Sequence, residues 1–188
     1  VPGHPLRTLA DENRALEKLV AETRAVLDHL RNEPEHRGGP ADRARLADLA
    51  DSLAGIEKHY LKKENQLFPR LEARGVAGPS KVMWAVHDDI RAHLKDFRRA
   101  VELGDKELIL RAGSWVLQEI ADMIGKEEKV LFPMCLEMFD EADWAAVKRG
   151  EEEIGFAWIA PPPDWTPGRA GQAPGAASAA GPDRKSGE

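Results

Sequence analysis

The sequence predicts an all-α protein: an up-down bundle of four long helices with a short extra C-terminal helix and a disordered tail. Three observations support this fold class. Only three prolines occur between Ala41 and Gly155, in a stretch rich in Glu, Leu, Ala, Lys and Arg, which favour helices. Apolar residues recur at helical spacing, and no alternating β-branched run indicates a strand. The connections between the apolar stretches are of modest length, as in a bundle.

The first predicted helix covers about residues 5–31, and Pro5 suits its first turn because the N–H that proline lacks would have no partner there. Residues 32–40 form a connection. The second helix covers about 41–74, and the third covers 79–103.

The fourth predicted helix begins after Gly104 and Asp105, where the Asp105 side chain can cap the first free N–H groups. A short helix then fits residues 141–153. The apolar stripes of the four long helices form the expected core, which includes Leu9, Leu16, Leu46, Ile56, Leu67, Met83, Ile90, Phe97, Ile120, Ile124 and Leu131.

The C-terminal residues differ in composition from the rest of the chain. Residues 161–188 hold 6 of the 13 prolines and 5 of the 16 glycines, and they contain no Leu, Ile, Val or Phe. Such a segment buries too little apolar surface to offset the entropy lost on ordering. We therefore expect a bundle over residues 1–160 and a Pro/Gly/Ala-rich tail over 161–188, its first part packed on the bundle and the rest disordered.

The composition excludes several classes of protein. Cys135 is the single cysteine, so no intramolecular disulfide or all-cysteine metal site exists, and we expect it to be a core thiol. No apolar stretch is long enough to span a membrane, and the N-terminus lacks the layout of a signal peptide, so we expect a cytoplasmic protein. A net charge of −6 disfavours general nucleic-acid binding. Without a nucleophile or phosphate-loop motif, the sequence favours a non-enzymatic role.

The chain contains a weak internal repeat. The segment KKENQLFPRLE (62–72) returns as KEEKVLFPMCLE (126–137) with an offset of 64 residues. A bundle made of two similar helix pairs places equivalent positions around its central axis, where a metal centre would fit.

Charged residues inside the apolar stripes are the candidates for a functional site. Glu127 lies in the stripe between Ile124 and Leu131, and a carboxylate facing a core needs a cation, a metal or a proton. Lys63 holds the equivalent position in the second helix and also points inward. A metal centre and a Lys63–Glu127 ion pair both remain open.

The histidines are less clearly placed. His87 and His93 flank the third stripe at similar angles, so periodicity does not decide which one faces inward. We expect His29 and His36 to be solvated or hydrogen-bonded outside the core. The neighbouring charged residues Lys62, Glu128 and Lys129 are expected on solvated faces.

Three segments together carry a family resemblance. HYLKKENQLFPRLE (59–72), KVMWAVHDDIRAHL (81–94) and GKEEKVLFPMCLE (125–137) resemble the hemerythrin-like HHE cation-binding family. Residues 3–13 and 152–167 look like the branch that often precedes a PAS sensor domain, which implies a PAS or other signalling domain as a partner. The resemblance implies a four-helix bundle around a non-haem di-iron centre, with the segment through Pro167 packed on the bundle by Trp158 and Trp165.

The family's usual ligands are single histidines from the first and third helices and a His-x-x-x-Glu pair from each of the other two. In the second helix His59 matches, but Lys63 replaces the acid and Glu64 follows one residue later. In the fourth helix Glu127 matches, but Met123 replaces the histidine.

His87 matches the third helix, and His4 matches the first with a one-residue offset. The resemblance therefore implies the candidate metal ligands His4, His59, Glu64, His87 and Glu127. Residues five apart diverge on a straight helix, so we expect a π-bulge or other distortion between His59 and Glu64 if both bind metal.

Three functions remain open. The first is a non-haem iron centre, di-iron or mono-iron, that binds or senses O2, NO or redox state with a reduced ligand set. The second is a haem-binding variant of the bundle with His59, His87 or Met123 as ligands. The third is a metal-free interaction or signalling module in which a Lys63–Glu127 pair replaces the metal.

Overall fold

The computed structural model describes residues 1–32 and 39–166, and the regular elements of these residues are all helices. In chain order these are α1 (Pro5–Asn32), α2 (Pro40–Leu53), α3 (Ile56–Lys62), η1 (Lys63–Leu67), α4 (Phe68–Glu72), α5 (Gly78–Leu103), α6 (Lys106–Lys126), η2 (Glu127–Leu131), α7 (Phe132–Met138) and α8 (Glu141–Ile154). This confirms the all-α bundle and the short extra helix.

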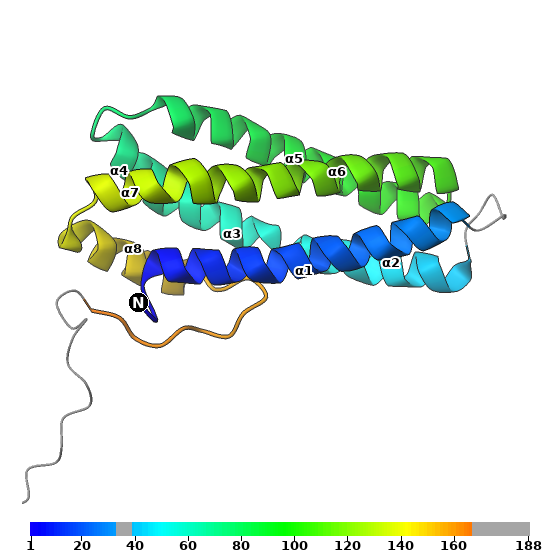
Figure 1. Cartoon of the computed structure of the whole chain (residues 1–188), viewed down its shortest axis with the longest axis horizontal. Coiled ribbons are helices and arrows are strands. Elements are labelled where there is room, and N and C mark those ends of the chain that lie inside the picture. The colour runs from blue at the N-terminus through cyan, green and yellow to red at the C-terminus, as the bar shows by residue number, and fades with distance from the viewer. Residues whose placement is uncertain (33–38, 167–188) are drawn as a thin grey trace, which may run out of the picture.

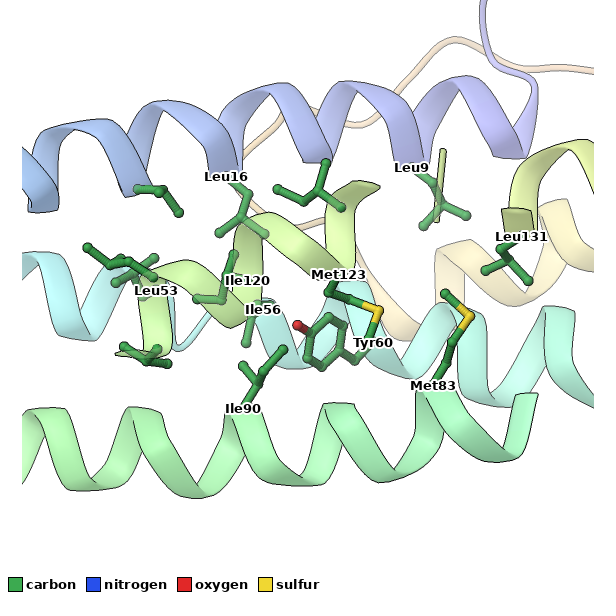
Figure 2. Close-up of a cluster of buried hydrophobic side chains, with 14 of the residues drawn as sticks. Leu9, Leu16, Leu53, Ile56, Tyr60, Met83, Ile90, Ile120, Met123 and Leu131 are labelled. Carbon is green, nitrogen blue, oxygen red and sulfur yellow. The ribbon is translucent and has the colours of Figure 1, made fainter. Parts of the chain in front are cut away.

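The long helices pack as a closed ring of neighbours. α1 lies beside α2, α2 beside α5, α5 beside α6, and α6 beside α1 (Figure 1). α8 covers one end of the bundle, where it packs against α1, α3 and η1. Figure 2 shows the side chains that fill the centre, with Leu9 and Leu16 from α1 facing Tyr60 and Ile90 from α3 and α5.

The second long helix is interrupted, whereas the sequence predicts one helix over 41–74. α2 ends at Leu53 and α3 begins at Ile56. A side chain at Gly55 would lie 2.7 Å from the indole nitrogen of Trp158, so glycine permits this close approach. The same indole N–H donates to the backbone oxygen of Ser52 at 2.7 Å. The break between α2 and α3 is therefore the place where Trp158 of the C-terminal segment packs against the bundle.

Two π-helical turns, η1 and η2, lie directly before the two Phe-Pro pairs. In η1 the N–H of Phe68 bonds the carbonyl of Lys63, five residues back, and η2 repeats this pattern. Proline has no N–H, and its ring collides with the carbonyl four residues earlier in a regular α-helix. The wider turns before Pro69 and Pro133 relieve that collision.

The distortion expected between His59 and Glu64 is present as η1, which begins at Lys63. Glu64 is buried rather than turned to solvent, with 3% of its surface exposed. The sequence does not predict the second π-helical turn, η2.

The segment after α8 returns along the bundle. Trp158 and Trp165 both pack against the hydrophobic core, as expected. The expected disorder of residues 168–188 lies outside the described residues, and the domain boundary near residue 160 stays a prediction. In the part of the chain that the structure describes, no helix is both long enough and apolar enough to span a membrane.

Candidate functional site

A cluster of buried charged side chains lies inside the bundle at the level of η1 and η2. We call it the central cluster, and each member is at most 3% exposed. Its members are Glu12, His59, Lys62, Lys63, Glu64, His87 and Glu127. They come from α1, α3, η1, α5 and η2, so the cluster connects elements from all sides of the bundle.

His59 bridges two carboxylates. Its Nδ1 lies 2.8 Å from Oε2 of Glu12, and its Nε2 lies 3.0 Å from Oε2 of Glu127. A carboxylate oxygen only accepts hydrogen bonds, so the ring satisfies both contacts when both nitrogens carry a proton. In that form His59 supplies a positive charge between the two acids.

Lys63 and Glu127 form a second buried contact. The ammonium of Lys63 donates to Oε1 of Glu127, and both side chains are fully buried. Burial alone would raise the pKa of Glu127, but the charges of Lys63 and His59 outweigh burial and hold that pKa well below its usual range. Glu127 is therefore ionised and paired with cationic side chains of the protein itself.

Glu12 collects three donors. Oε1 accepts from the ammonium of Lys62 and, at 2.8 Å, from the backbone N–H of Ala157, while Oε2 contacts His59. The expectation that Lys62 is solvated is wrong, since Lys62 is 2% exposed. Through Ala157, Glu12 also ties the C-terminal segment to the bundle.

His87 is held by Glu64 and Tyr60. Nδ1 of His87 lies 2.7 Å from Oε1 of Glu64, and the same oxygen accepts a hydrogen bond from Arg91 at 3.0 Å. The imidazole ring of His87 stacks on the ring of Tyr60, with centroids 3.8 Å apart. Burial, followed by the charge of Lys63, lowers the pKa of His87 to about 4, so the ring is neutral near pH 7. Nδ1 then carries the proton, and the buried Nε2 has no hydrogen-bond partner among the described residues.

The inward-facing residue on α5 is His87 and not His93. His93 is one-third exposed and contacts Oε2 of Glu119 at 2.6 Å. On the surface, His29 contacts Asp42 at 2.8 Å, outside the core as expected, while His36 lies outside the described residues.

His4 lies apart from the central cluster. Its ring packs against Trp144 and Trp165, at centroid distances of 4.6 and 4.9 Å, and its Nδ1 accepts from the N–H of Leu6 at 3.2 Å. The structure thus brings together four of the five candidate ligands in two bonded pairs, His59 with Glu127 and His87 with Glu64. His4 is not among them.

Met123 and Cys135 are core residues. Met123 is 1% exposed, so a haem ligated there would have to displace packed side chains. Cys135 is fully buried, and burial raises the pKa of its thiol to about 12, which confirms the expected core thiol.

Two buried polar residues of α1 are missing from the sequence-based site. Glu12 and Asn13 are both fully buried, and they lie three and four residues after Leu9 on the same apolar stripe. The spacing that identifies Glu127 would have identified them as well.

The fold and the central cluster define a helical-bundle domain of the hemerythrin type. A family model described as the Hemerythrin HHE cation binding domain matches residues 4–135, and the chain belongs to this family. The matched region includes every residue of the central cluster. No curated protein matches the chain.

The family is named for binding cations, which makes a metal the first hypothesis for the central cluster. In residues 1–32 and 39–166, no group of three or more His, Cys, Asp or Glu side chains is arranged to hold a metal ion. His59 and Glu127 instead bond each other, and an ammonium occupies the second oxygen of Glu127. The donors in this arrangement do not fit a di-iron centre.

Proposed function

We propose that this chain is a metal-independent HHE-type bundle, in which the Lys63 ammonium serves as a built-in cation and the domain acts as a protein-interaction module. The observation that carries the proposal is the hydrogen bond from Lys63 to Glu127 at the position where the family's pattern has an acid. An acid at residue 63 would add a metal ligand, whereas a lysine supplies positive charge.

Charge explains why the two kinds of centre exclude each other. At an effective dielectric constant of 20, a divalent ion about 4 Å from an ammonium is repelled by roughly 8 kcal/mol. Burial lowers the pKa of Lys63, and Glu127, the nearest opposing charge, acts against that change. An ion pair of this kind holds Glu127 without metal.

Buried ion pairs cross-link the interior of the domain. The sequence contains no catalytic nucleophile motif and no phosphate-binding loop. The outer surface of the domain carries several exposed large apolar side chains, which suit contacts with other proteins. These include Val82, Trp84, Leu103, Trp115, Val130 and Leu136. We propose a cytoplasmic signalling role, with a PAS or other signalling domain as one class of partner.

A second candidate function rests on His87. Glu64 holds Nδ1 of this ring and leaves the buried Nε2 without a described partner, which is how carboxylates orient metal-binding histidines. Glu12 holds Nδ1 of His59 in the same way. A single iron that responds to O2, NO or redox state would then use His59, His87 and Glu127, once Lys63 had withdrawn.

Metal analysis with a visible spectrum separates these candidates. The protein is purified without added metal, then incubated with Fe(II) under anaerobic conditions and desalted. The proposal predicts a colourless protein with far less than one metal ion per chain. Stoichiometric iron would support the second candidate, and a Soret band would indicate haem.

A further inference from the structure

One side of α6, next to α5, carries a stripe of residues spaced three or four apart. Its members are Leu108, Arg111, Trp115, Glu119 and Asp122, and we call them the α6 stripe. Trp115 at its centre is 59% exposed, an unusual loss of apolar burial for so large a side chain.

Two grooves meet at Trp115, and Arg111 lines both of them. One groove of about 470 Å³ lies between α5 and α6, and its charged residues include Asp96, Arg99 and Arg111. The other runs along α6, where Glu119 and Asp122 contribute acidic side chains. Along α6, the exposed Trp115 therefore has the basic Arg111 four residues before it and the acidic Glu119 four residues after it.

This arrangement is complementary to itself. When two copies of α6 cross antiparallel about a two-fold axis at Trp115, a residue four positions before Trp115 faces the residue four positions after it in the other copy. Arg111 and Glu119 hold these two positions. The axis therefore creates two Arg111–Glu119 pairs around a central pair of tryptophans.

We propose that the α6 stripe is a docking surface for a second copy of this chain. Arg111 forms no ion pair with any residue that the structure describes, so its guanidinium is available to the second copy. Glu119 contacts His93 through Oε2. A like-charged partner would meet repulsion at one of the two ends, whereas a second copy matches both.

The expected dimer is weak. One helix from each copy makes the contact, so the buried area falls below that of a standard protein–protein interface. Self-association then depends on protein concentration. Self-association through the α6 stripe rests on the proposed interaction role. Metal content tests that proposed function, and sedimentation tests self-association. Because the two are measured separately, failure of one is distinguishable from failure of the other.

A charge-exchange experiment tests the interface. Wild type, Arg111→Glu and Glu119→Arg are examined by sedimentation velocity over a range of concentrations, separately and as an equimolar mixture of the two variants. Each variant alone places like charges opposite each other and should weaken self-association by about tenfold or more. The mixture restores opposite charges at both pairs and should associate within about threefold of wild type.

Two controls keep the result specific. Arg24→Glu makes the same charge change at an exposed position of α1 and should leave self-association unchanged. Trp115→Ala removes the central anchor and should abolish association while the far-ultraviolet circular dichroism stays helical. A wild-type protein that stays monomeric at millimolar concentration, an Arg111→Glu protein that associates like wild type, or a mixture that does not recover would each overturn the proposal.

Discussion

Lys63 and Glu127 are 64 residues apart in the sequence and hydrogen-bonded to each other in the interior of the bundle. The offset of the internal repeat is the same 64 residues, so the two side chains occupy equivalent positions in the two halves. Where the family's pattern places an acid at both positions, this chain has one acid and one base. The pair thus neutralises itself across the repeat, and this is the basis of the metal-independent centre that we propose.

The first prediction concerns the stability provided by this pair. Lys63→Met leaves the carboxylate of Glu127 buried with His59 as its remaining charged contact, and breaking a buried pair in this way costs about 3–5 kcal/mol. The free energy of unfolding in urea should fall by that amount. Lys129→Met removes an exposed lysine of η2 and should change it by less than about 0.5 kcal/mol.

A double variant tests the cause of that loss. Lys63→Met with Glu127→Gln removes both charges but leaves an oxygen to accept from His59, so the double variant should be more stable than Lys63→Met alone. If the double variant loses as much as the two single variants together, the two side chains act independently and the pairing is refuted.

The second prediction concerns the C-terminal segment. Glu12→Ala removes the acceptor for the N–H of Ala157 and for Lys62, so residues 155–158 should detach more often from the bundle. Hydrogen exchange should accelerate in that segment by about tenfold or more. Glu17→Ala, at a partly exposed position of the same helix, should leave the exchange unchanged. Equal exchange in the Glu12 variant and wild type would contradict the role of Glu12 as an anchor.

The third prediction concerns pH. Burial raises the pKa of Glu151 to about 7, while the charges of Lys148 and Lys62 act against burial. The folded state therefore favours the protonated acid, and the stability that this preference contributes at low pH is lost as the pH rises from about 4.5 through 7.

Glu151→Gln cannot ionise, so its stability relative to wild type should increase by roughly 2–3 kcal/mol between pH 4 and pH 8. Thermal unfolding of both proteins across that range measures the difference. Glu153→Gln, at an exposed position of the same helix, should show no such trend. If the difference in stability between Glu151→Gln and wild type does not change with pH, folding does not raise the pKa of Glu151, and the prediction is wrong.

The sequence predicts the helices and part of the site because both depend on periodic burial. Glu127 lies within an apolar stripe, and this position alone indicates that it needs a buried partner. Lys63 follows as the equivalent residue of the repeat. The choice between His87 and His93 needs the structure, since the two positions are symmetric about the stripe of α5.

Other features depend on contacts that periodicity does not represent. The π-helical turn η1 shifts the register of the helix, so Lys62, Lys63 and Glu64 are all buried, although a regular α-helix would turn one of three consecutive residues outward. The break at Gly55 depends on Trp158, more than a hundred residues later. The break arises from this long-range packing and leaves no local pattern in the chain, whereas the π-helical turns lie directly before the two Phe-Pro pairs.

The most direct test restores the two residues that depart from the family's ligand pattern. Lys63→Glu and Met123→His are combined, and iron bound per chain is measured beside wild type after identical anaerobic loading and desalting. Wild type should retain almost no iron, and the double variant should retain about one ion or more per chain. Stoichiometric iron in wild type, with Lys63 in place, would contradict the claim that its ammonium replaces the metal.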